Sequence, residues 1–122
     1  MNLKISKAAQ LYFVLSDLSA KELSFTTAYR IKRNLDHLKA IGEKYTEEIK
    51  AEYQKLLPTK AEYQDAEIKY YSAMADAAVY KKWDESGEEE DLDLKVLSFE
   101  NEDIKFSARQ IAVLEPILTL EP

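Results

Sequence analysis

The chain has 122 residues, 46% of them hydrophobic and 33% charged, with no Cys, one His, two Gly and a formal net charge of −6. These counts exclude disulfides, thiolate metal sites and thiol nucleophiles, and they leave little for a His-rich metal site or a glycine-rich phosphate loop. The length fits one domain over residues 1–122, and the negative charge disfavours direct contact with nucleic acid.

The N-terminal segment is expected to be extended and then helical. Leu3 and Ile5 alternate with polar residues, as in a short strand. Ser6 can cap a helix over 7–18, in which the leucines follow helical spacing. This stretch is too short and too polar to span a bilayer, and no small-residue cleavage site follows it. We therefore expect neither membrane contact nor export.

The next two elements are expected to form a long helical hairpin. Apolar residues recur every three or four positions over 25–57, which predicts a helix that Pro58 ends. A capping box that begins at Thr59 predicts a second amphipathic helix over 60–84. Such a short connection favours two antiparallel helices, although one kinked helix also fits the pattern.

An acidic run follows the hairpin. The ten residues from Asp84 to Asp93 hold seven acids and no base, and outside them positive and negative residues nearly cancel. Because these acids repel one another and offer nothing to bury, we expect a solvated loop over about 84–93. Their order around Gly87 does not match a calcium-binding loop, so we expect no metal there.

The last part of the chain is expected to contain a small β element and a short helix. Alternating apolar residues predict a strand over 94–99, with 104–106 as its hairpin partner. Ser107 has the spacing of a capping box before a helix over 108–115. The predicted fold class is therefore mainly α, with a long antiparallel hairpin, an N-terminal helix, a small β element and a short C-terminal helix.

The sequence contains no recognisable catalytic or cofactor-binding constellation. His37 lacks ligands at helical spacing, and no pair of carboxylates stands out among the 23 acids. Arg30, Lys32 and Arg33 form a basic patch, but a nucleic-acid site would need more positive charge and a recognisable reading element. We interpret the patch as an exposed helix face that pairs with acidic surface, and we expect no enzyme activity and no cofactor.

The tyrosines are the most informative feature for binding. Six of the eight lie between Tyr45 and Tyr80, and two consecutive ones cannot both point into a single helical seam. Tyr is enriched at protein interfaces, although these rings could equally line the edges of the hairpin. The candidate partner-binding residues are Tyr53, Tyr63, Tyr70, Tyr71 and Trp83, together with the acids Glu88, Glu89, Glu90 and Asp91.

The order of features also carries a resemblance. Leu3-Lys4-Ile5 leads into an apolar helix, Ala28-Tyr29-Arg30-Ile31 opens a long charged helix, and a strand precedes the segment from Ser107 to Leu118. In this order the features resemble small, uncharacterised accessory proteins of tailed bacteriophages and prophages. The resemblance implies a phage or prophage origin and a role without catalysis.

Two functional hypotheses follow. The first is a protein that acts by protein–protein contact in virion assembly or in the infected host cytoplasm, through the Tyr-bearing hairpin and as a homo-oligomer. The second is an acidic inhibitor of a host defence nuclease or another nucleic-acid enzyme, in which the acidic run imitates phosphate.

Overall fold

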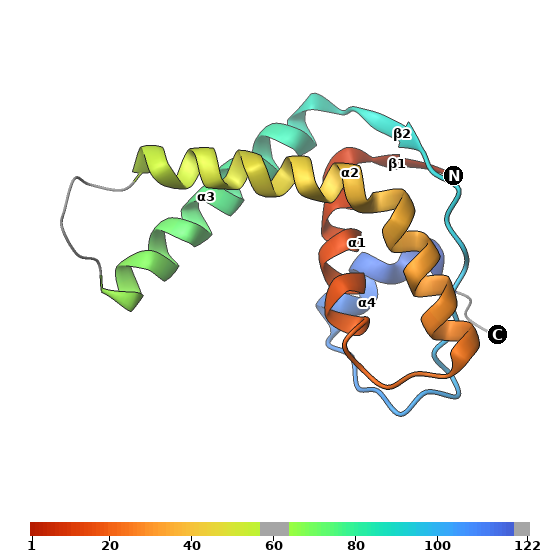
Figure 1. The fold of residues 1–122 in the computed structure, drawn as a ribbon. Helices are drawn as coiled ribbons and strands as arrows, with labels where there is room; N and C mark the ends of the chain where they lie inside the picture. The colour runs from red at the N-terminus through yellow and green to blue at the C-terminus, as the bar shows by residue number, and fades with distance from the viewer. Residues whose placement is uncertain (57–63, 119–122) are drawn as a thin grey trace.

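The computed structural model describes residues 1–56 and 64–118, and it has the predicted fold class (Figure 1). Helix α2 is followed by an antiparallel α3, so the hairpin is confirmed, and the Thr59 capping box lies outside the described residues. In chain order the elements are β1 (Asn2–Lys4), α1 (Ile5–Leu18), α2 (Phe25–Leu56), α3 (Asp65–Ser86), β2 (Glu89–Asp91), α4 (Ala108–Leu114) and the 3₁₀ turn η1 (Glu115–Ile117). No helix in the described ranges is both long and apolar enough to cross a bilayer.

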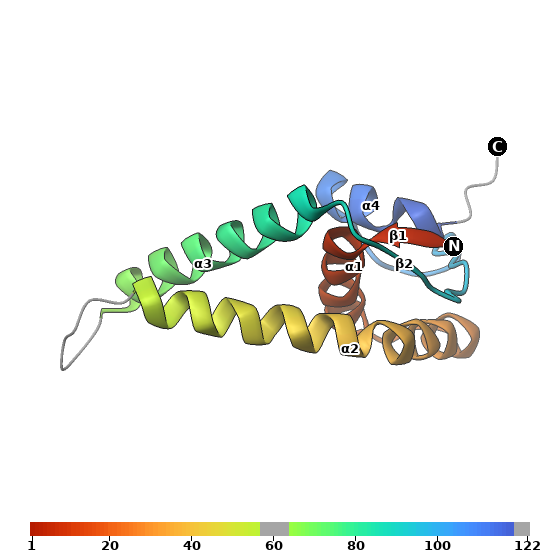
Figure 2. The same ribbon diagram turned by 90° about the horizontal axis from the view of Figure 1, so that it is seen from above.

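The molecule consists of a body and an arm. The outer ends of α2 and α3, residues 49–56 and 65–77, project from the body and form the arm (Figures 1 and 2). The body is built from α1, the first half of α2, α4 and the segment that returns from β2. Its most deeply buried large side chains are Leu11, Leu15 and Leu18 of α1, Ile31 and Leu38 of α2, Leu97 of the returning segment, Leu114 of α4 and Ile117 of η1.

Helix α1 packs closely across α2 at a glycine. A Cβ atom on Gly42 would overlap the ring of Tyr12, so the ring occupies the place of a side chain. The Thr46 hydroxyl donates to the Gly42 carbonyl at 2.9 Å, and such back-bonding favours bending of a helix. Helix α2 changes direction where it passes α1 (Figure 1).

The small β element lies at a different place from the predicted one. Strands β1 and β2 pair antiparallel, with Leu3 opposite Glu90. The expectation that the whole acidic run would be a loop is therefore wrong, because three of its residues form β2. All three β2 side chains stay exposed, so the backbone pairs with β1 without desolvating the carboxylates.

The predicted strand over 94–99 and its partner at 104–106 are wrong. In this region the structure has one isolated bridge, between Leu97 and Leu118. Leu94 and Leu97 are buried whereas Val96 is 45% exposed, so the alternation that suggested a strand does not continue. The segment is held by hydrogen bonds to the side chain of Asn34 in α2 and to the carbonyl of Ile117 in η1, and these replace the bonds to a neighbouring strand.

The helix ends follow local capping chemistry except at the first helix. Helix α1 begins at Ile5, and Ser6 lies buried inside it and donates to Asp84 at 3.2 Å, so the predicted Ser6 cap is wrong. Helix α3 begins with a capping box from Gln64 and ends at Gly87, whose φ of 65° suits glycine. The predicted Ser107 capping box is confirmed, with its hydroxyl accepting from the Gln110 N–H at 3.1 Å.

Candidate functional site

One side of α3 is covered by the rest of the protein. Ala75, Val79 and Trp83 recur every four residues along it and are buried. The Trp83 ring lies edge-on to Tyr45 with centroids 5.0 Å apart, and its Nε1 donates to Glu48 Oε2 at 2.7 Å. Trp83, which the sequence assigned to a partner surface, is only 5% exposed and belongs to the core, so that assignment is corrected.

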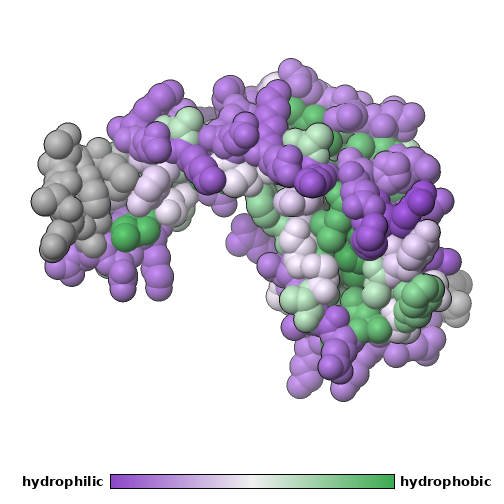
Figure 3. All heavy atoms as spheres, viewed as in Figure 1, coloured by the Kyte–Doolittle hydropathy of each residue, from purple (hydrophilic) through white to green (hydrophobic). Residues whose placement is uncertain are grey.

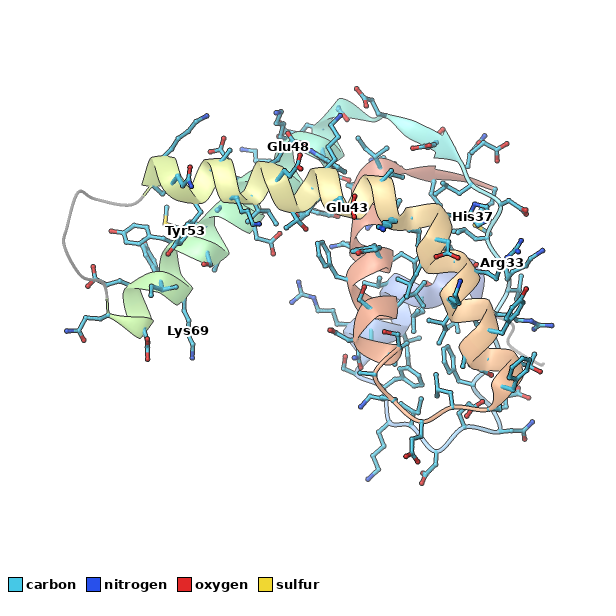
Figure 4. The ribbon with its side chains drawn as sticks, viewed as in Figure 1. Arg33, His37, Glu43, Glu48, Tyr53 and Lys69 are labelled. Atoms are coloured by element: carbon cyan, nitrogen blue, oxygen red, sulfur yellow. The ribbon has the colours of Figure 1, made fainter. Side chains whose placement is uncertain are left out.

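Two further polar contacts join α2 and α3 at the edge of this covered side. The Tyr45 hydroxyl donates to Asp76 Oδ1 at 2.6 Å, and burial together with this bond raises the pKa of Tyr45 well above its usual range. Lys82 Nζ donates to Glu48 Oε1 at 2.9 Å, which raises the pKa of Lys82. Glu48 lies where the two helices meet (Figure 4) and binds two successive residues of α3.

The opposite side of α3 is also apolar. Tyr70 is 61% exposed and Met74 is 40% exposed. At 100° per residue they lie away from the buried stripe, together with three exposed alanines. We call this surface the outer face, and its residues are Ala66, Tyr70, Ala73, Met74 and Ala77. Helix α3 therefore has two apolar sides, and the described part of the chain covers one of them.

A groove adjoins the outer face where the arm meets the body. It has a volume of about 700 Å³, and Ala73 and Ala77 belong to both surfaces. Figure 3 shows a hollow between the arm and the body. The apolar lining consists of Phe13, Val14, Ile49, Ala73, Ala77 and Val113, and Arg109 and Gln110 add polar groups.

The predicted tyrosines are divided between exposed and half-buried positions. Tyr70 is exposed, whereas Tyr71 beside it is half-buried, and their rings meet edge to face with centroids 5.3 Å apart. Tyr53 is half-buried on the arm (Figure 4). Tyr63 lies outside the described residues. Of this set, Tyr70 is the residue that contributes most to an open surface.

The predicted acidic residues lie elsewhere. Glu88, Glu89, Glu90 and Asp91 are exposed in and before β2, which lies away from the end of the arm (Figure 1). Three of the seven acids of the run are paired with bases. Asp84 pairs with Lys4 at 3.4 Å, Glu85 with Lys81 at 4.0 Å, and Asp91 with the terminal ammonium group at 3.1 Å. The structure therefore does not bring the tyrosines and the acids together into one site.

Sequence reasoning missed two surfaces. The groove was missed because Ala73 and Ala77, two of the four α3 residues that line it, are small, and their four-residue spacing is the signal that could have identified it. Phe25 and Tyr29 stack at the start of α2 with centroids 6.1 Å apart, and both are exposed. Their four-residue separation places them on one side of the helix and could have predicted the pair.

The remaining candidate groups are the acidic and histidine side chains and the basic patch of α2. Within residues 1–56 and 64–118, no three His, Cys, Asp or Glu side chains are grouped to hold a metal ion. The basic patch is partly engaged, because Lys32 pairs with Asp36 at 3.0 Å and Arg30 donates to the Val96 carbonyl at 3.3 Å. Arg33 and His37 lie on the exposed side of α2 (Figure 4).

Comparison with known proteins gives no match: no family model, no curated protein and no solved structure is similar to this chain.

Proposed function

We propose that this chain is a protein-interaction module without catalytic activity, which binds its partner through the outer face of α3. The observation that carries the proposal is that α3 is apolar on two opposite sides while the described residues cover one. A helix that is apolar all round is normally buried, and exposed aromatic side chains are enriched at interfaces. We further propose that the module is a phage or prophage accessory protein that acts in the infected host cytoplasm or in virion assembly.

The shape of the outer face favours a helix as the bound element. Its alanines allow a partner backbone to approach closely, while Tyr70 supplies one large ring that can insert between side chains. The groove continues this surface toward α1 and α4, so a helix lying along α3 would also meet Phe13 and Val113.

Inhibition of a nucleic-acid enzyme by the acidic run is supported less well. A phosphate mimic needs an extended array of free negative charges, and three of the seven acids are paired within the chain.

Site-specific photo-crosslinking in cells tests the proposed function. A photoreactive residue at Ala73 on the outer face should give one defined adduct, and Ala77→Arg should suppress it. The matched control is the same photoreactive residue at Ala40, an exposed alanine of α2. Adducts that are equally strong at both positions, or that persist in the Ala77→Arg variant, would contradict the proposal.

A further inference from the structure

We propose that the partner of the outer face is a second copy of this chain, with the two α3 helices antiparallel and Lys69 of each copy beside the partner's Asp76. This inference rests on the proposed function, because it uses the same outer face. It adds the identity of the partner and the register of the contact.

The charges beside the outer face are arranged to complement a second copy. Lys69 and Asp76 are seven residues apart, which is about 10.5 Å along the helix and within about 20° around it. They are exposed and flank the outer face on the same side. Consider a twofold axis that runs between the two helices, perpendicular to them, at the level midway between Lys69 and Asp76. This axis brings each Lys69 level with the partner's Asp76. One axis therefore creates two identical ion pairs.

The sizes of the apolar side chains select the same register. In this arrangement Ala73 lies almost on the twofold axis, and Tyr70 comes level with the gap between the partner's Ala73 and the partner's Ala77. A large side chain of each helix then fits between two small ones of the other, as in knobs-into-holes packing. Charge and shape are independent features of the sequence, and both favour this one alignment.

Both charged groups are available for the contact. Lys69 points away from α2 (Figure 4), and none of the described residues forms an ion pair with it. The Tyr45 hydroxyl bonds Asp76 at Oδ1, which leaves Oδ2 of that carboxylate for a lysine. Because the arm projects from the body (Figures 1 and 2), a second helix can approach along its length. The apolar contact would supply the affinity, and the ion pairs would select the register.

A charge-reversal pair tests the ion pairs. In a dimer of Lys69→Asp chains each new Asp faces the partner's Asp76, and in a dimer of Asp76→Lys chains each new Lys faces the partner's Lys69. Each variant alone should associate about tenfold more weakly than the wild type by sedimentation or light scattering. An equimolar mixture should recover wild-type association, because the mixed dimer has two attractive pairs. Lys50→Asp, at an exposed lysine on α2, makes the same charge change away from the outer face and should leave the dimer intact.

Disulfide trapping tests the register with Asp76 unchanged. This second test is needed because Asp76→Lys loses the hydrogen bond from Tyr45 and can unfold for that reason alone. The chain has no Cys, so each engineered thiol is the only one present. Ala73→Cys should form a disulfide-linked dimer on mild oxidation because it lies near the axis. Ala66→Cys should not, because the two thiols would be about 20 Å apart along the helices.

The outcomes distinguish the register of the dimer, the identity of the partner and the use of the outer face for binding. Equal trapping at positions 66 and 73, or failure of the mixed charge variants to recover association when both are folded by circular dichroism, would overturn the register. A wild-type chain that remains monomeric while Ala73 still crosslinks to a different protein would overturn the second copy as partner and leave the proposed function intact. A monomer without any adduct at Ala73 would overturn both.

Discussion

The carboxamide of Asn34 bonds both backbone groups of Lys95. Its Nδ2 donates to the Lys95 carbonyl at 2.9 Å, and its Oδ1 accepts from the Lys95 N–H at 2.6 Å. Asn34 is fully buried in α2, so a single side chain provides the two hydrogen bonds that a neighbouring strand would otherwise make. This contact fixes the returning segment against the body.

Replacing Asn34 by Ala should therefore destabilise the body. The variant loses both hydrogen bonds and leaves a small cavity beside the core, and we expect a loss of about 2 kcal/mol in the free energy of unfolding. Urea denaturation followed by circular dichroism measures this change. Asn101→Ala, at an exposed position, should change stability by less than about 0.5 kcal/mol. Equal effects of the two substitutions would show that the Asn34 bonds contribute nothing.

Gly42→Ala should destabilise the protein although alanine is the better helix former. On an open helix surface this change gains about 1 kcal/mol. Here the new methyl group would overlap the Tyr12 ring, and we expect a net loss of about 1–3 kcal/mol. In a Tyr12→Ala background the same substitution should become neutral or stabilising. A thermal-denaturation double-mutant cycle measures the coupling, and additive effects would contradict the close packing.

Glu48→Ala should loosen the junction of α2 and α3. The substitution removes acceptors from Trp83 Nε1 and Lys82 Nζ, and we expect a loss of about 1–2 kcal/mol. Trp83 is the only tryptophan, so its fluorescence reports directly on this junction. Glu47→Ala, at an exposed neighbouring glutamate, should leave both stability and the emission spectrum unchanged. A spectrum that is the same in both variants would contradict the contact.

The link between Glu102 and Ser24 should make stability sensitive to acid. The hydroxyls of Ser24 and Thr27 and the Ser24 N–H lower the pKa of Glu102 below its usual 4.5. A lowered pKa in the folded state stabilises the fold at neutral pH, and this contribution disappears as the pH falls through the lowered value. Wild type should therefore be more stable than Glu102→Gln at neutral pH, and the difference should shrink in acid. Urea midpoints across this range measure it, and a constant difference would contradict the linkage.

The hydroxyl of Tyr45 should remain protonated in strong alkali. Because the pKa of Tyr45 is raised above its usual 10.0, this residue keeps its proton where exposed tyrosines ionise. Ultraviolet titration of wild type and Tyr45→Phe should give the same rise in phenolate absorbance near pH 10. In the unfolded chain Tyr45 ionises near its usual pKa of 10.0, which is lower than its pKa in the folded protein. The stability that the protonated Tyr45 contributes is therefore lost as the pH rises above 10. A smaller rise in the variant would show that Tyr45 ionises normally.

The helices could be predicted because their signals are local. Helix α2 was expected over 25–57 and spans Phe25–Leu56, and α4 was expected over 108–115 and spans Ala108–Leu114. Apolar spacing and capping residues act over one or two turns, so the sequence displays them directly. The pairing of β1 with β2 could not be predicted in this way. It joins two three-residue segments from distant parts of the chain, and the β2 segment is composed of acids that normally disfavour strands.

The candidate site could be predicted in part. The 100° separation of Tyr70 and Tyr71 correctly required different surroundings for the two rings, and Tyr70 is exposed. Trp83 was misassigned because a large amphipathic ring suits a core and an interface equally well. The alanines of the outer face were overlooked because alanine is common on every side of a helix. Their arrangement becomes informative only once the buried side of α3 is known.

The position of the core along the chain has a consequence for synthesis. The apolar sides of α1 and α2 are covered by Leu97, Leu114 and Ile117, which the ribosome adds after α3 is complete. Helices α2 and α3 are neighbours in sequence, and the hydrogen bonds that Lys82 and Trp83 donate to Glu48 involve no later residue. A nascent chain whose α3 has left the ribosome can therefore pair α2 with α3 while the body is still open. The outer face of α3 is then accessible to a partner before Val113 of the adjoining groove has been synthesised.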